Sequence, residues 1–220
     1  MSIRPFQSKR ELLKYSRVLL RVMVRNYRKD MSICLRRNGD GSHAYFPALM
    51  TSIGFLDFLS GLYAGTLERH SLHELKAYAG RFMNPSHYDS LRLEILYEMF
   101  RHKLAHLGYL PVVFDTATKP KTFSIQKRLT WTVYASKRTQ PIEIKDFTTP
   151  QYLTREHYPR WQIPYDCRVR ISLRRLQTDI IKSINGRSGY LSALEGESTL
   201  LEKFAACMRY YFPPPKDKPR

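Results

Sequence analysis

Residues 85–108 decide the fold that we expect for this chain, and they read PSHYDSLRLEILYEMFRHKLAHLG. Apolar residues recur in this stretch at the spacing of one helix face, namely Leu93, Leu96, Tyr97, Phe100 and Leu104. Asn84 followed by Pro85 is typical of a helix start, and Gly108 is typical of the position just beyond a helix end. The stretch therefore predicts one long helix from Pro85 to about Leu107, with its apolar side in the core.

The same helical periodicity occurs at other places along the chain. It predicts helices over residues 8–29, 45–67, 71–82, 172–185 and 198–211. The second of these is apolar on nearly every side, and Asp57 is its only charged residue. A helix of that kind belongs at the centre of a helical bundle.

Between the predicted helices, from residue 112 onward, apolar and polar residues alternate as they do in strands. The alternating segments are short and lie at residues 123–125, 129–134, 142–144 and 169–171. Residues 146–164 contain several prolines, and we expect them to be irregular. The pattern predicts a small antiparallel sheet or a pair of hairpins.

These elements predict a single, mainly α unit of the α+β class. Residues 1–111 are expected to form a helical core, and residues 112–212 a β-hairpin region with C-terminal helices that pack on the same unit. Residues 213–220 consist of prolines and charged residues and predict a disordered tail.

The net charge is the most unusual feature of the composition. The chain has 37 Lys and Arg against 19 Asp and Glu, which gives +18 at pH 7. A field of that sign attracts polyanions, so nucleic acid is the first partner to consider. An acidic membrane surface is the second, but we expect no membrane partner because no apolar run reaches the roughly 20 residues that span a bilayer.

Cysteine and histidine spacing gives no sign of a metal site. Cys34, Cys167 and Cys207 are far apart in the sequence, and no His or Cys pair has the spacing of metal ligands. We therefore expect neither a metal nor another cofactor. The first ten residues contain no apolar segment, which predicts reduced thiols and a cytoplasmic location.

The first predicted helix has a row of cations on one side, which we call the basic face. Its members are Arg10, Lys14, Arg17, Arg21, Arg25 and Arg28, at intervals of three or four residues. Phosphates along such a row would give salt-dependent RNA binding with little sequence preference. The alternative is a solvated helix face that keeps the protein soluble.

The end of the 85–108 stretch contains an arginine and a histidine separated by four residues, Arg101 and His106. This arrangement resembles the motif of HEPN domains, which are all-helical RNases and RNA-binding modules. Similar spacings elsewhere, such as Arg81 to His87, lie in predicted loops or between helices. Only Arg101 follows a long packed helix, and the residue after it, His102, is polar as the family favours.

The resemblance to HEPN domains implies a HEPN-like helical bundle and a metal-independent endoribonuclease. A histidine base would take the proton of the ribose 2′-OH, and a guanidinium would stabilise the charge that grows on the phosphorane. His106 and Arg101 fit these two roles. HEPN domains commonly pair, which implies a composite site in a homodimer. The resemblance also implies a toxin or phage-defence role, in which a cognate antitoxin or regulator protein is a further partner.

Several residues near the motif are candidates for support. Glu98 and His102 lie four residues apart, so Glu98 can orient His102 or pair with Arg101. Asp57 needs a partner if it is buried, and Arg101 is the partner that we expect. We also expect Lys103 to contact RNA.

Other interpretations remain open. Cations at a helix end also simply complement the helix dipole, without forming a site. A non-catalytic RNA- or nucleotide-binding module would use the same cations without turnover. A DNA-binding regulator is a third hypothesis, based on charge alone.

Overall fold

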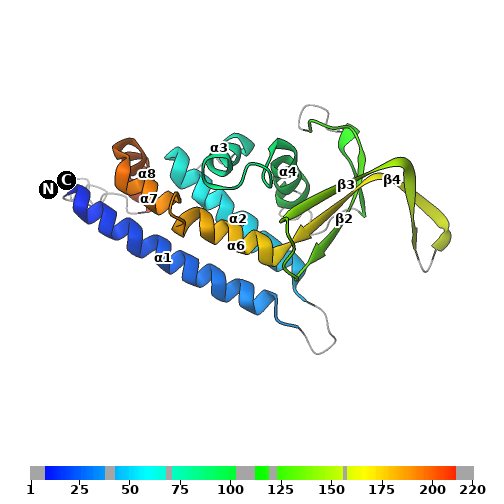
Figure 1. The fold of residues 1–220 in the computed structure, drawn as a ribbon, viewed down its shortest axis with the longest axis horizontal. Helices are drawn as coiled ribbons and strands as arrows, with labels where there is room; N and C mark the ends of the chain where they lie inside the picture. Colours follow the sequence, from blue (N-terminus) through cyan, green and yellow to red (C-terminus); the bar gives the residue numbers. More distant parts are fainter. Residues whose placement is uncertain are drawn as a thin grey trace, which may run out of the picture.

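The computed structural model describes residues 8–37, 43–67, 71–102, 112–118, 123–155 and 158–211. Figure 1 shows an elongated molecule with the helices gathered at one end and a sheet at the other. The expected tail at residues 213–220 lies outside the described residues.

Helices make up most of the described chain. They are α1 (Lys9–Cys34), α2 (Tyr45–Ala64), α3 (Leu72–Phe82), α4 (Ser90–Glu94), the π-helix η1 (Ile95–His102), the short 3₁₀ turn η2 (Thr116–Thr118), α6 (Leu173–Asn185), α7 (Tyr190–Gly196) and α8 (Ser198–Tyr211). The strands are β1 (Val113–Asp115), β2 (Arg128–Tyr134), β3 (Ile142–Arg155) and β4 (Tyr158–Ser172).

Helix starts follow the capping residues in the sequence. The Ser8 hydroxyl accepts a hydrogen bond from the Glu11 backbone N–H at 3.2 Å. Ser71 caps α3 in a capping box with Glu74. Such caps satisfy backbone N–H groups that have no partner within the helix. The predictions of these two starts are confirmed, although α1 continues to Cys34, beyond the expected end.

The apolar helix α2 lies at the centre of the helical layer, as predicted. It packs against α1, α3, α6, α8 and η1. By length and composition α2 is the one helix among the described residues that could cross a membrane, but 56% of that segment is buried inside the protein. This burial is compatible with a soluble protein.

The prediction of one helix from Pro85 onward is wrong. The Asn84 side chain accepts a hydrogen bond from the Ser86 backbone N–H at 3.0 Å and so caps a turn rather than a helix. The turn lets Tyr88 enter the core, where it is 2% exposed. The helix α4 begins after this turn, with Asp89 as its N-cap, and it passes directly into η1.

The predicted fold class, a helical bundle with a small antiparallel sheet, is also wrong. The protein is an α+β structure whose four-stranded mixed sheet has the order β1-β2-β4-β3. The strands β2 and β4 run parallel, from Leu129 opposite Cys167 to Tyr134 opposite Ser172. The strands β3 and β4 have 14 and 15 residues and pair antiparallel, and their distal parts form an arm in Figure 1.

The long strands include residues 146–155 and 158–164, which were expected to be irregular because of their prolines. Pro150 and Pro164 fit because the described strands leave each of them without a ladder partner on at least one side. Pro150 is on the edge strand β3, within the register shift between Asp146 and Gln151. Pro164 lies in the part of β4 that β2 does not reach.

A single hydrophobic core joins the sheet to the helices. Val169 and Ile171 of β4 are fully buried, and so are Leu176 and Ile180 of α6, which follows β4 directly. The Ser172 side chain caps α6, as predicted, by accepting a hydrogen bond from the Arg175 backbone N–H.

Candidate functional site

The predicted motif begins in the π-helix η1. A π-helix has hydrogen bonds from residue i to i+5; it is rare, and it occurs frequently at functional sites. Ile95, Leu96, Met99 and Phe100 of η1 are fully buried, so one side of the helix is fixed in the core. The Arg101 side chain is 26% exposed and reaches solvent. Arg101 and His106 are residues i and i+5 in the sequence, the same interval as a π-helical hydrogen bond. His106 and Lys103 themselves lie outside the described residues.

Arg101 is held by a carboxylate from the centre of α2. Asp57 Oδ2 accepts a hydrogen bond from Arg101 Nε at 2.9 Å and forms an ion pair with Arg101 Nη2 at 2.8 Å. The Arg101 guanidinium also lies over the Tyr97 ring, with its Cζ 4.6 Å from the ring centroid. The ion pair that the lone carboxylate predicted is present, and together with the ring it fixes the plane of the guanidinium.

Both groups of this pair keep unused hydrogen-bonding capacity. A guanidinium has about five N–H donors, and Asp57 is the one acceptor that engages them among the described residues, through Nε and Nη2. Asp57 Oδ1 is buried and has no hydrogen-bond partner among the described residues. An oriented guanidinium with donors to spare can bind a phosphate in a defined geometry.

A second carboxylate, which the sequence analysis missed, fixes the start of η1. Glu94 is 4% exposed, and it accepts hydrogen bonds from Lys76, Ser90 and the Ser124 backbone N–H. Burial alone would raise the pKa of Glu94, but these hydrogen bonds outweigh it and lower the pKa below its usual value. Glu94 therefore connects α3, α4 and the loop before β2 at the point where η1 begins.

The other predicted support residues stay predictions. Glu98 is half-buried on η1, and no contact of it with Arg101 is established. The backbone of His102 ends η1, but its side chain lies outside the described part of the chain.

The basic face of α1 is exposed along its whole length. Its members Arg10, Lys14, Arg17, Arg21, Arg25 and Arg28 are all exposed. One acid from a different helix reaches it, because Glu195 Oε1 of α7 accepts a hydrogen bond from Arg17 Nε at 3.0 Å and forms an ion pair with Arg17 Nη2 at 2.9 Å. Nearly half of each side chain in this pair is exposed, so the pair contributes little to stability.

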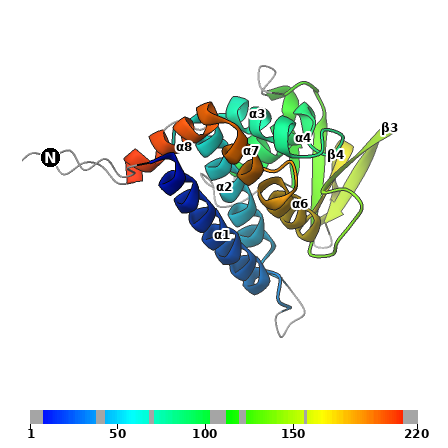
Figure 2. The same cartoon turned by 60° about the vertical axis from the view of Figure 1, so that its left-hand side comes forward.

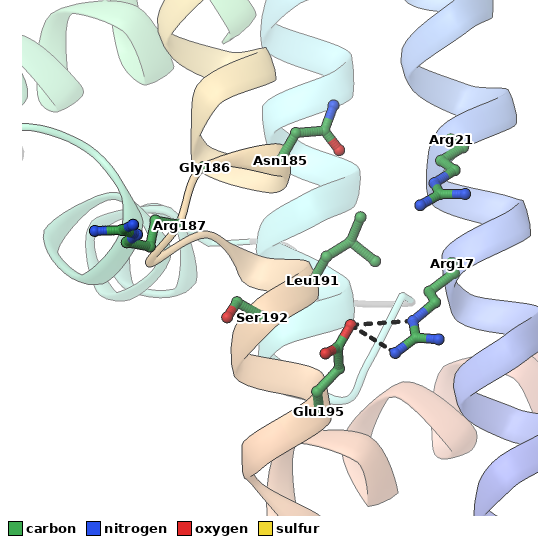
Figure 3. Close-up of a pocket in the computed structure, with 8 residues that line it drawn as sticks. All are labelled: Arg17, Arg21, Asn185, Gly186, Arg187, Leu191, Ser192 and Glu195. Carbon is green, nitrogen blue, oxygen red and sulfur yellow. Dashed lines mark hydrogen bonds and ion pairs between the residues drawn. The ribbon is translucent and has the colours of Figure 1, made fainter.

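A cavity of about 400 Å³ lies beside the basic face, between α1 and the α6–α7 connection. Figure 3 shows Arg21 and Asn185 extending toward the gap between the helices, with Arg17 held by Glu195 below them. Arg187 also lines the cavity but extends away from α1. The arginines at its α1 wall make this a cationic hollow beside the basic face, where a backbone phosphate would fit.

The basic face and Arg101 are not brought together. In Figures 1 and 2, α2 and α6 lie between α1 and the α4 helix that leads into η1. Arg101 and the basic face therefore lie on two separate sides of the helical layer.

The described residues contain no cluster of three or more His, Cys, Asp or Glu side chains that could hold a metal ion. The three cysteines are free thiols. Burial raises the pKa of Cys167 to about 12 and that of Cys207 to about 11, so neither is a reactive nucleophile at neutral pH.

Comparison with known proteins gives no relative: no family model, no curated protein and no solved structure matches this chain. The similarity of the Arg101–His106 segment to HEPN domains therefore stays a prediction based on the residues.

Proposed function

We propose that this protein is a metal-independent endoribonuclease whose reacting groups are Arg101 and His106. The observation that carries the proposal is the fixed guanidinium of Arg101, which Asp57 and Tyr97 hold at the exposed side of a π-helix. The resemblance of the motif to HEPN domains supplies the histidine partner. The proposal depends on these residues and not on a helical-bundle fold.

In the proposed reaction, His106 removes the proton of a ribose 2′-OH. The 2′ oxygen attacks the adjacent phosphorus, and the bond from phosphorus to the 5′ oxygen breaks. The products are a 2′,3′-cyclic phosphate and a 5′-OH, whose proton comes from a second acid. The spare N–H groups of Arg101 bind the phosphorane oxygens, where negative charge grows.

A homodimer would supply that second acid. We propose that two copies place their motifs face to face, so that the histidine of one copy acts as base and that of the other as acid. Each Arg101 would then contact the same phosphate from one side. The basic face of α1 would hold the flanking RNA through its phosphates.

The test is cleavage of an unstructured RNA in EDTA by the full chain. General acid–base help is worth about 10²- to 10⁴-fold, so His106→Ala should slow cleavage by that factor. Arg101→Ala should slow cleavage to a similar degree, whereas the exposed His73→Ala and Arg209→Ala serve as matched controls and should leave it unchanged. Cleavage that needs a divalent metal, or that survives His106→Ala, would refute the proposal.

A non-catalytic RNA-binding module is the second candidate, and the exposed basic face favours it. It predicts salt-dependent binding of RNA without cleavage under any condition. A DNA-binding regulator, the third hypothesis, predicts that duplex DNA competes better than single-stranded RNA of equal charge.

The cellular setting that we propose follows the resemblance. A ribonuclease of this kind would act in the cytoplasm, as a toxin or a phage-defence effector, and an antitoxin protein would restrain it. Growth arrest on expression of the wild type, but not of the His106→Ala variant, would support this setting.

A further inference from the structure

A second cavity, of about 410 Å³, lies between the start of α2 and the strand β2. Its walls include His43, Tyr45, Phe46 and Trp131. Phe46 is 39% exposed, so its ring is accessible from the cavity. The described residues that line this cavity carry no charged Lys, Arg, Asp or Glu side chain.

The aromatic wall of this cavity is rigid. The Trp131 ring lies between two others: the Phe46 centroid is 5.5 Å away, and the Phe100 centroid is 6.0 Å away on an edge-to-face contact. Phe100 is fully buried, so it supports Trp131 from the core side. The His43 and Tyr45 rings lie 5.4 Å apart on the α2 side of the cavity.

One polar atom of a residue that lines the cavity has no hydrogen-bond partner in the described part of the chain. His43 Nδ1 is buried and makes no hydrogen bond with any described residue. A buried polar atom without a partner is costly, and it is rare in native proteins unless a ligand or water satisfies it. A purely apolar occupant would leave this cost in place, so the fitting ligand has a flat apolar face and a polar edge.

We propose that this cavity binds one unstacked nucleobase of single-stranded RNA. The base would stack on the Phe46 and Trp131 rings, and a donor or acceptor on its edge would pair with His43 Nδ1. Single-stranded RNA is recognised by this combination of aromatic stacking and edge hydrogen bonds. The net charge of +18 favours a polyanion as the molecule that brings the base. The inference deepens the proposed function, on which it rests, because it specifies the substrate as single-stranded.

The position of the cavity connects it to Arg101. Phe46 and Asp57 are eleven residues apart on α2, which is about three turns, so they lie on nearly the same side of that helix. The rise between them is about 16 Å, which about five nucleotides can span at ~3.4 Å or more each. On the other wall, Trp131 contacts Phe100, whose neighbour in η1 is Arg101. A base in the cavity would thus place the same strand near the guanidinium.

Tryptophan fluorescence gives a direct test. The chain has two tryptophans, so a Trp161→Phe protein keeps Trp131 as its one reporter. The probe is a single-stranded oligonucleotide with 2′-O-methyl riboses, which cannot be cleaved because it has no 2′-OH. An abasic oligomer of the same length and charge is the matched ligand.

We expect the base-containing probe to quench Trp131 and the abasic oligomer not to. Phe46→Ala should weaken binding of the base-containing probe by about 5- to 100-fold and leave the abasic oligomer unaffected. His43→Ala should weaken the same probe with no change in its salt dependence. Tyr152→Ala is the control, because Tyr152 is another exposed ring, 56% exposed, on the distant arm. Circular dichroism of each variant checks that it is folded.

Equal quenching by the two ligands, or equal losses in Phe46→Ala and Tyr152→Ala, would overturn the inference. So would a Phe46→Ala protein that binds the probe normally but changes from dimer to monomer, since the cavity would then face a second copy. The probe does not report on cleavage. Base-dependent quenching without RNase activity would reject only the proposed function, and RNase activity without base-dependent quenching would reject only this site.

Discussion

Removal of the Asp57 carboxylate or of the Arg101 guanidinium tests the ion pair on which the proposed site depends. The two side chains are 14% and 26% exposed, and one carboxylate oxygen, Asp57 Oδ2, contacts both Nε and Nη2 of Arg101. Loss of one partner from a fully buried pair costs about 3–5 kcal/mol, whereas a fully exposed pair is worth about 0–1 kcal/mol. This pair lies between the two limits, so we expect Asp57→Ala to lower the free energy of unfolding by about 2 kcal/mol.

The double-mutant cycle of Asp57→Ala and Arg101→Ala separates the pair from the rest of each side chain. We expect a coupling energy of about 1–2 kcal/mol, because the double variant no longer leaves an unpaired charge. For a chain of this length, each kcal/mol shifts the unfolding midpoint by about 2–4 °C, so each single variant should melt about 4–8 °C lower. The measurement is thermal and urea unfolding followed by circular dichroism.

The pair between Arg17 and Glu195 is the matched control. It has similar N–O distances, but its side chains are 47% and 46% exposed. Its coupling energy should be at most about 1 kcal/mol. Equal coupling in the two cycles would refute the reasoning, because it would mean that burial does not strengthen the Asp57–Arg101 pair. Undetectable coupling in the Asp57–Arg101 cycle would refute it as well.

Three further predictions concern acid stability, a backbone conformation and salt dependence. Glu94→Gln should lower the free energy of unfolding at pH 7 by about 1–3 kcal/mol. The pKa of Glu94 is lowered in the folded protein, so its carboxylate stabilises the fold above the unfolded pKa of about 4.3, and this stabilisation is lost as the pH falls. The unfolding free energies of the variant and the wild type should therefore converge below about pH 4. Gly65→Ala should destabilise by about 1–2 kcal/mol because Gly65 has φ +90°, whereas Gly80→Ala, with open space at its Cβ, should be neutral or stabilising in the same melts. Replacing Arg21 and Arg25 by Ala should reduce the slope of log binding constant against log salt by up to about 1.4 for single-stranded RNA; an unchanged slope would place the phosphates elsewhere.

Local signals made three of the helix starts predictable. Ser8, Ser71 and Ser172 each cap a helix because their side chains satisfy N–H groups within three residues, so no distant contact is needed. The prediction of the start of α4 was wrong because the choice between two local caps depends on a distant contact. Asn84 and Asp89 are both good caps, and only the burial of Tyr88 in the folded protein selects Asp89.

Long-range pairing made the sheet unpredictable. Prolines in a sequence argue against a central strand, but they are tolerated on an edge, and the sequence does not tell which strand is the edge. The parallel pairing of β2 with β4 joins segments separated by the whole of β3. The π-helical winding of η1 likewise depends on how its apolar side chains enter the core, because the same residues also fit an α-helix.

The candidate site was predictable only where chemistry forced a pairing. Asp57 is the lone charge in an apolar helix, so it required a cation, and Arg101 was the expected one. Glu94 looked like an ordinary polar residue on an amphipathic helix, and its burial comes from contacts with Lys76 and Ser124, far from it in sequence. Phe46 gave no signal at all, because a ring at the start of an apolar helix is indistinguishable from a core residue.

The separation of the basic face from Arg101 constrains how one RNA can use both. A strand that lies along α1 must pass around α2 or α6 to reach η1, since these helices lie between. A strand held in the cavity at Phe46 has a shorter path to η1, because this cavity lies at α2 and its Trp131 ring contacts Phe100 of η1. Under the two proposals, a short strand would be positioned by the cavity and Arg101 alone, and the basic face would add affinity only for longer RNA. Cleavage of short single strands should accordingly depend less on salt than binding of long ones, because fewer phosphates are neutralised.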